Sequence, residues 1–150
     1  LYEQLELLKK NKVAVVCGIL SGTLASLTGI FVLCMLFGFN HQQYVTMLPK
    51  SITTAIGIGI SEELGGIVTI TVAVIIITGI LGNVIADTVF HIFKIKNPLA
   101  KGLALGTASH AIGTARAIEM GPVEGAMSSL AVAVAGLLTV VFVSGFAQLI

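Results

Sequence analysis

The residues best suited to chemistry lie in a short segment from Gly106 to Gly125, which places His110, Arg116 and Glu119 among small and hydroxyl residues. A guanidinium stays charged in proteins and presents a planar fork of donors that fits a carboxylate. An imidazole titrates near neutral pH and can pass on a proton. We therefore predict a site for a small carboxylate, in which Arg116 clamps the carboxylate and His110 couples protons.

Neighbouring residues of the same segment add neutral hydrogen-bonding groups. The hydroxyls of Ser109 and Thr114 would contact the rest of the substrate, and Thr107 adds a further neutral donor. Glycines and Pro122 argue against one smooth helix, and helix ends opened in this way present free backbone N–H groups that favour anions. We predict hinges at three glycines of this segment: Gly106, Gly113 and Gly121.

Two alternatives without a ligand stay open for these charged residues. Arg116 and Glu119 are three residues apart and could form an ion pair on one helix face. Glu119 would then be a charge partner or a gating residue. His110 could be satisfied by a backbone carbonyl of a neighbouring element.

A second polar segment, residues 49–66, is a weaker copy of the first. At an offset of 56 residues, 55–57 align with 111–113 and 63–65 with 119–121, giving five identities and two conservative matches over thirteen positions. Arg116 has no counterpart, because Ile60 occupies the aligned position. Only one copy therefore holds a cation in its middle, and we predict the carboxylate end of the substrate there.

The second segment also carries candidate site residues. Its hydroxyls either line the substrate pathway or bond to their own helix backbone; they belong to Ser51, Thr53 and Thr54. Lys50 and Glu63 are either charge partners of the site or anchors at the membrane surface, and Gly57 is a further predicted hinge.

The elements that must position these groups are membrane helices. The chain is 56% hydrophobic and 10% charged, with a mean hydropathy of +1.06, whereas soluble domains carry roughly 25% charged residues. Charge-free runs cover 13–39, 65–86 and 125–150, and about 20 apolar residues suffice to cross a bilayer as a helix. We predict an all-α, polytopic membrane helix bundle with spans at 13–37, 67–93 and 125–150, and a polar connection at 39–44.

Lysine positions predict how the chain crosses the membrane, because short cytoplasmic loops are rich in Lys and Arg. Both lysine groups, at 9–12 and 94–101, reach the same face only if residues 49–66 enter and return on the other face. The two glycine-broken segments would then be re-entrant from opposite faces, as an inverted repeat. Near the end of the second span, Asp87 and His91 are four residues apart and are expected to pair at the interface.

Several function classes find no support in this sequence. The net charge is +1 and no basic patch alternates with aromatic residues, so we expect no nucleic-acid partner. There is no nucleophile elbow and no metal-ligand spacing. We therefore expect neither an enzyme nor a bound cofactor or metal.

Two motifs carry a family resemblance. Residues 49–54 (Pro-Lys-Ser-Ile-Thr-Thr) and 102–116 (Gly-Leu-Ala-Leu-Gly-Thr-Ala-Ser-His-Ala-Ile-Gly-Thr-Ala-Arg) strongly resemble the LrgB/CidB family, as do residues 1–10. The chain departs from the family pattern at Ala55, where a proline is usual. The resemblance covers the whole chain, residues 1–150, and implies a transmembrane domain that forms the C-terminal part of a longer protein.

What the resemblance implies about function is divided. Bacterial members are described as antiholin-like or holin-like proteins that modulate murein hydrolases and lysis with a small LrgA/CidA-type partner. Plant relatives are plastid glycolate/glycerate translocators, and some bacterial relatives are linked to pyruvate uptake. We favour a transporter of small 2-oxo or 2-hydroxy monocarboxylates in the bacterial cytoplasmic membrane, with a possible homo-oligomer; the lysis regulator is the alternative.

Overall fold

Three long helices form where the sequence is free of charge. In this computed structural model, which describes residues 4–150, they are α2 (Lys12–Leu36), α5 (Val68–Ile92) and α7 (Pro122–Ala147). At 1.5 Å per residue each is about 37–39 Å long, enough for a hydrocarbon core of about 30 Å. All three are long and apolar enough to span a membrane. The prediction of an all-α membrane helix bundle is confirmed.

The outward faces of these helices suit lipid. On α5, Ile77, Leu81 and Val84 are each more than half exposed, and on α7 Leu137 and Val141 are likewise. Such a continuous apolar surface would be unfavourable in water but contacts acyl chains in a bilayer. The protein is a multi-pass membrane protein.

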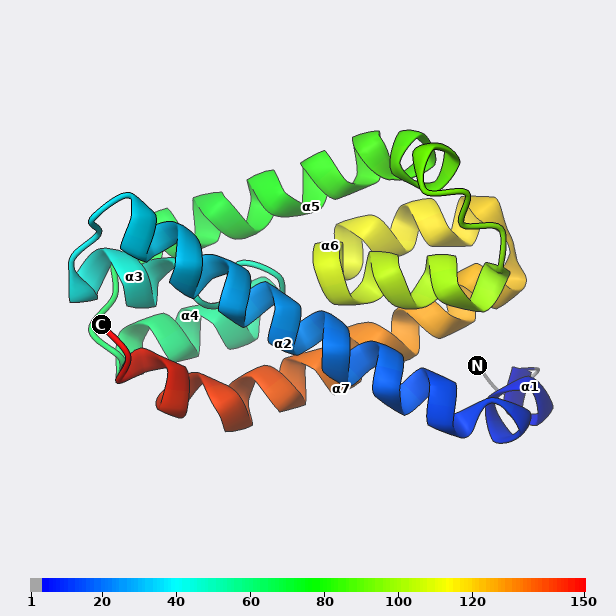
Figure 1. The fold of residues 1–150 in the computed structure, drawn as a ribbon, viewed down its shortest axis with the longest axis horizontal. Coiled ribbons are helices and arrows are strands. Elements are labelled where there is room, and N and C mark those ends of the chain that lie inside the picture. Colours follow the sequence, from blue (N-terminus) through cyan, green and yellow to red (C-terminus); the bar gives the residue numbers. More distant parts are fainter. Residues whose placement is uncertain (1–3) are drawn as a thin grey trace.

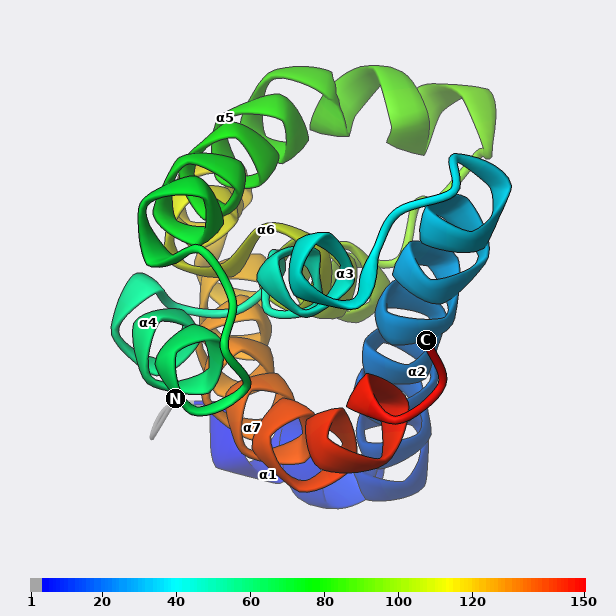
Figure 2. The same cartoon turned by 90° about the vertical axis from the view of Figure 1, so that its left-hand side faces the viewer.

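Four further helices within residues 4–150 complete the bundle. They are α1 (Leu5–Lys10), α3 (His41–Met47) and α4 (Thr54–Glu63), together with α6 (Pro98–Met120). The end-on view shows α3 in the middle with α6 behind it, while α2, α5 and α7 lie towards the outside (Figure 2).

Helix α3 corrects the predicted polar connection at 39–44. It begins at His41 with a capping box: the Gln43 amide N donates to Asn40 Oδ1 (2.9 Å), and the Asn40 amide N donates to Gln43 Oε1 (3.0 Å). A capping box satisfies two amides that would otherwise lack partners at a helix start. Because α3 has only seven residues, its apolar pattern is too short to be detected from hydropathy.

Replacing Asn40 by alanine should destabilise the protein by about 1 kcal/mol, because the side-chain acceptor of the cap is lost. The measurement is the midpoint of thermal unfolding in detergent. Asn40→Asp keeps an acceptor at the same place and should unfold close to the wild-type temperature. Equal losses in both variants would show that the cap does not stabilise α3.

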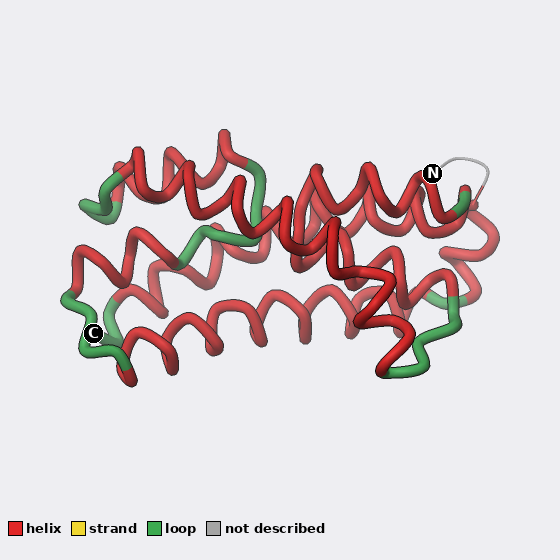
Figure 3. Tube along the Cα trace, turned by 90° about the horizontal axis from the view of Figure 1, so that it is seen from above, coloured by secondary structure: helices red, strands yellow, loops and turns green. Residues whose placement is uncertain are grey.

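α3 and α4 form a helical hairpin whose tip, residues 48–53, lies inside the bundle (Figure 3). Their opposite directions follow from the contact of Ile67 N with Thr46 Oγ1 (2.8 Å), which brings the segment after α4 back beside α3. The arms have seven and ten residues, or about 10 and 15 Å. The hairpin therefore covers residues 41–63, whereas 49–66 was predicted, and its tip lies beside the middle of α2. That this hairpin is re-entrant in a membrane stays a prediction.

α6 is also a hairpin, since its backbone leaves the helical region at Ser109 (φ −130°, ψ 15°) and His110 (φ 43°, ψ −138°). Its first half, 98–108, runs parallel to α7: Gly102 lies against Glu124 and Gly106 against Ser128. Its second half, 111–120, is antiparallel to α7, with Thr114 bonded to Ser128 and Ile118 beside Gly125. The two halves therefore fold back on each other (Figure 1).

The position of this break differs from the predicted hinges. Gly106 and Gly113 lie inside the helical halves of α6 and Gly57 lies inside α4, whereas Gly121 does lie between α6 and α7. Position 106 requires a glycine for packing and not for a hinge, because a Cβ there would collide with the carbonyl oxygen of Ser128. The first of these glycines thus allows close helix packing rather than a bend.

The two hairpins enter from opposite ends of the bundle (Figure 1). Leu7 and Asn11 line one surface pocket together with residues 97–99, so both lysine groups lie at the same end, as the positive-inside argument predicts. We call this the lysine-rich end, defined by Lys9, Lys10, Lys12, Lys94, Lys96 and Lys101. The bounds of α2 and α5, 12–36 and 68–92, also differ by 56 residues at both ends. A common origin of the two halves stays a prediction.

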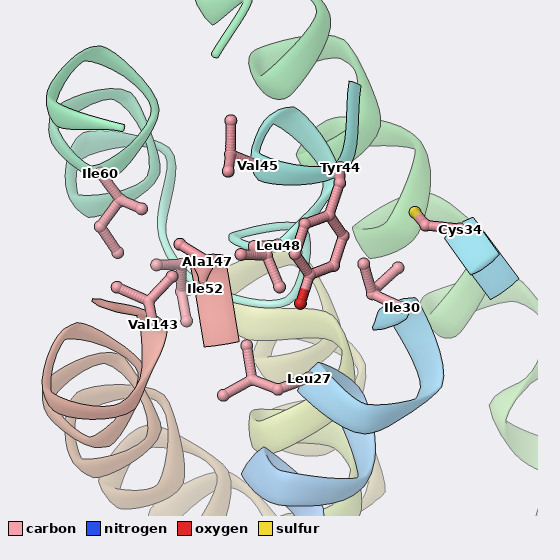
Figure 4. Packing of buried hydrophobic residues seen from close by; sticks show 10 residues of the cluster. All are labelled: Leu27, Ile30, Cys34, Tyr44, Val45, Leu48, Ile52, Ile60, Val143 and Ala147. Carbon is pink, nitrogen blue, oxygen red and sulfur yellow. The ribbon is translucent and has the colours of Figure 1, made fainter. Parts of the chain in front are cut away.

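The largest apolar cluster packs around the α3–α4 hairpin, at the end of the bundle opposite to the lysine-rich end. Figure 4 shows Tyr44, Leu48 and Ile52 packed between Leu27 of α2 and Val143 of α7. Tyr44 is fully buried, and its hydroxyl donates to the carbonyl of Phe146 at 2.9 Å. Burying this face excludes lipid and fixes the position of the hairpin tip.

Candidate functional site at the hairpin tips

The tip of the α3–α4 hairpin touches α2 near the middle of that helix. The Ser26 hydroxyl of α2 donates to Ser51 Oγ of the tip at 3.0 Å. Ser26 lies 14 residues beyond the start of α2, or about 21 Å along it. The tip therefore brings polar groups to mid-depth.

Lys50 brings a positive charge to the same place. Its ammonium donates to Ser51 Oγ at 2.7 Å. Ser51 Oγ accepts from both Ser26 and Lys50, which leaves its own O–H available to a ligand. Both salt bridges found among residues 4–150 belong to Arg116, so Lys50 has no carboxylate partner in the described part of the chain.

Further hydroxyls surround a small cavity beside the tip. Its volume is about 10 Å³, the space of a single water. Three buried threonines of the cavity donate to carbonyls of their own helices, at 2.7–2.9 Å: Thr23, Thr107 and Thr139. Their lone pairs remain free to accept from a substrate hydroxyl or from water. We call these three threonines, with Ser26 and Ser51, the hydroxyl cluster.

A groove connects the lysine-rich end with this cluster. It runs between α2 and the first half of α6, from Ala14 and Asn97 to Lys50, with a volume of about 780 Å³. Small residues keep it open, for example Gly18 and Gly22 on α2. A small anion entering at the lysine-rich end could thus approach the ammonium along this groove, whose walls are mainly small apolar residues.

His110 and Ser109 lie on the opposite side of the α6 tip, against α5. The His110 Nε2 is 2.9 Å from the carbonyl oxygen of Ile75, and the residue is 3% exposed. Gly79 makes room for this imidazole, since a Cβ there would lie 2.7 Å from His110 Cε1. Of the two alternatives for this histidine, the structure contains the contact with a backbone carbonyl.

Arg116 is paired with two carboxylates. Its guanidinium contacts Glu119 at 2.6 Å, on the same helix face, and also bonds to Asp87 of α5. Arg116 lines neither the groove nor the small cavity. The expected pair of Asp87 with His91 is therefore wrong, because the packing of α5 against α6 brings the arginine to this carboxylate.

The structure brings together only part of the predicted site. Ser51 and Lys50 lie at the tip, whereas Thr53 precedes α4 and Thr54 begins it. Thr114 bonds to Ser128 at 2.8 Å and to the carbonyl of His110 at 2.9 Å. Glu63 is exposed at the far end of α4, remote from the groove.

Three hydroxyl residues of the cluster, Thr23, Ser26 and Thr139, are absent from the predicted site. Thr23 and Ser26 are three residues apart inside a charge-free span, and this spacing places them on one helix face. That spacing could have identified these two residues as a polar face of the span from the sequence alone. Thr139 is one of four hydroxyl residues in the last span, and only its proximity to the tip distinguishes it.

Comparison with known proteins places this chain in one family. The model of the LrgB-like family matches residues 1–149. The antiholin-like protein LrgB of Bacillus subtilis (strain 168) is 40% identical over 150 residues, covering 100% of this chain and 65% of the relative. The antiholin-like protein LrgB of Bacillus cereus (strain B4264) is 41% identical over 146 residues, covering 97% and 64% respectively.

The chain thus spans slightly less than two thirds of the length of these curated relatives. No solved structure matches it. The family match covers every residue of both hairpins and of the three long helices. The chain belongs to the LrgB-like family.

Proposed function

We propose that this chain binds a small carboxylate at the hairpin tips and carries it across the membrane. One observation carries the proposal: Lys50 lies at mid-depth without a carboxylate partner among the described residues. A charged side chain at this depth is costly and is expected to pair. An anionic substrate would supply the missing partner.

The proposed substrate class is a 2-oxo or 2-hydroxy monocarboxylate such as pyruvate, glycolate or glycerate. Its carboxylate would accept from the Lys50 ammonium and the Ser51 hydroxyl. The 2-oxygen would meet the hydroxyl cluster, where Ser26 and Thr107 line both the groove and the small cavity. The narrowness of that cavity favours substrates with two or three carbons.

Binding would begin from the lysine-rich end, because the groove reaches Lys50 from there. Release at the other end requires the tip of the α3–α4 hairpin to move away from α2. Hairpins with short arms can shift as units around a fixed site, which is how many transporters with discontinuous helices alternate access.

Transport can be tested with the full-length protein in liposomes. Labelled pyruvate, glycolate and glycerate should enter by a saturable route that unlabelled substrate suppresses. Liposomes with inactive protein, heated before reconstitution, provide the background. Uptake of all three compounds at the background rate would contradict the proposal.

Replacing Arg116 by glutamine should leave the uptake within about threefold of the wild type, because this guanidinium is partly exposed and already held by two carboxylates, and exposed ion pairs contribute little. The measurement is the initial rate at several substrate concentrations. Asp87→Asn, which removes one of the two partners, is the matched variant. If Arg116→Gln abolishes uptake while expression stays normal, Arg116 rather than Lys50 binds the substrate carboxylate.

The relatives' names favour a second candidate, an antiholin-like regulator of lysis. In this proposal the chain acts on murein hydrolase activity together with a small LrgA/CidA-type partner. The test is complementation of a Bacillus subtilis strain that lacks its own LrgB, with autolysis rates as the readout. Restoration by Lys50→Gln as fully as by the wild type would separate lysis control from substrate binding.

A further inference from the structure

A second pocket lies at the lysine-rich end, between the end of α5 and the start of α6. Its volume is about 500 Å³, and it is lined by Phe90, His91 and Ile95 together with Asp87 and three lysines, Lys94, Lys96 and Lys101. Together with the apolar groove below it, the geometry points to a binding site for an anionic phospholipid. This site lies apart from Lys50 and the hydroxyl cluster, although its apolar groove ends beside Ser109 at the α6 tip.

The charge of the pocket favours an anion. Three ammonium groups face one carboxylate, and that carboxylate, on Asp87, is bonded to Arg116. The second acid near the arginine, Glu119, is held by the same guanidinium. The lysines are therefore left to interact with a phosphate. Basic pockets between membrane helices at the cytoplasmic side are a known way to hold lipid headgroups.

The lysines stand on a fixed backbone. The turn after α5 is closed by two hydrogen bonds, from Lys94 N to His91 O (3.2 Å) and from Ile95 N to Phe90 O (2.9 Å). Lys101 Nζ lies 5.7 Å from the centre of the Phe90 ring, within the range of a cation–π contact. These contacts hold the backbone of Lys94 and the side chain of Lys101 beside the pocket.

An apolar groove continues from the same phenylalanine towards the middle of the membrane. It has a volume of about 180 Å³, runs between α5 and the first half of α6, and is lined by Phe90, Val89, Ala86, Ala104 and Gly82. Phe90 lines both the basic pocket and this groove. A charged head above an apolar channel matches a phospholipid and not a free phosphate ester.

The depth of the groove agrees with one leaflet. Gly82 lies ten residues before the end of α5 at Ile92, which is about 15 Å along the helix and half of a hydrocarbon core of about 30 Å. One acyl chain of the lipid would lie in this groove, and the other would stay among the bulk lipids.

The test measures which lipids the full-length protein retains. The protein is purified in detergent, mixed with equal amounts of phosphatidylglycerol and phosphatidylcholine, and examined by native mass spectrometry. We expect phosphatidylglycerol to be preferred. A triple variant, Lys94→Gln, Lys96→Gln and Lys101→Gln, should lower this preference by about tenfold, since each lysine near an anionic lipid surface contributes favourably.

The matched control replaces the other lysines of the same end, Lys9, Lys10 and Lys12, which are exposed and lie outside the pocket. It should keep the preference. An equal loss of the phosphatidylglycerol preference in both variants would mean that the lipid responds to the overall surface charge, and this would overturn the site. An unchanged preference in the Lys94, Lys96 and Lys101 variant would also overturn it.

Two further measurements test the acyl groove. Val89→Phe narrows it and should reduce the number of retained phosphatidylglycerol molecules while leaving the lysines in place. Millimolar glycerol phosphate should fail to displace the lipid. Full displacement by glycerol phosphate, or retention unaffected by Val89→Phe, would overturn the lipid as the ligand. None of these readouts involves uptake, so this inference can fail or succeed apart from the proposed transport.

Discussion

Replacing Lys50 by glutamine should lower the uptake of a small carboxylate by roughly 10- to 100-fold, because a hydrogen bond to a charged group contributes about 1.5–3 kcal/mol and about 1.4 kcal/mol is a factor of ten. Glutamine keeps most of the side-chain volume and can still donate to Ser51. In the wild type the Ser51 hydroxyl accepts a hydrogen bond from the Lys50 ammonium. The loss should therefore report on the charge. The measurement is the initial rate in liposomes, below the concentration that saturates uptake.

Two variants control this result. Lys50→Arg keeps the charge but not the shape and should retain part of the uptake. Lys12→Gln removes a charge at the exposed start of α2, outside the groove, and should behave as the wild type. Wild-type uptake by Lys50→Gln would show that Lys50 does not bind the substrate, even if transport itself is confirmed.

Replacing Gly106 by valine should destabilise the protein by about 3 kcal/mol or more, the upper range for overpacking a tightly packed core. A Cβ at this position would collide with the carbonyl oxygen of Ser128 and lie 2.7 Å from the Cβ of Ala131. Because the obstacle includes backbone, a rotamer change cannot relieve it. α6 and α7 would have to move apart, which should disturb both halves of the α6 hairpin.

The measurement is the midpoint of thermal unfolding in detergent, with the yield of folded protein as a second readout. Gly29→Val is the matched control, because nothing lies within 4 Å of a Cβ at Gly29 in α2. Its unfolding should change by no more than about 0.5 kcal/mol, the difference in helix propensity. Equal midpoints for the two variants would show that the close approach of α6 and α7 is not rigid.

The spans could be predicted from the sequence alone because the membrane imposes them. Charge-free runs of more than 20 residues have few alternatives to a spanning helix, since every backbone group must be paired inside lipid. The bounds of α2 and α5 differ from the predicted ones by one residue at each end. α3 could not be predicted in this way, because its seven residues are stabilised by a cap and by tertiary packing.

The place of the α6 break also escaped prediction. The glycines of this segment predicted hinges at Gly106 and Gly113, but the non-helical residues are Ser109 and His110. His110 adopts φ 43°, which costs energy for a residue with a side chain. The contact of its imidazole with Ile75 and the packing of both halves of α6 against α7 compensate for that cost. These contacts join residues far apart in the chain.

The sequence by itself determined that this is a membrane helix bundle with two polar, glycine-rich segments and a few costly charges. It also determined that Arg116 has an acid within reach, since a spacing of three residues fixes neighbours on a helix. Only the tertiary structure decided that Asp87, 29 residues away, takes the other side of the guanidinium, and that Lys50 lies at mid-depth beside Ser26 and Ser51. The physical reason is that local spacing follows from helix geometry, whereas contacts between residues far apart in the chain depend on which helices pack together.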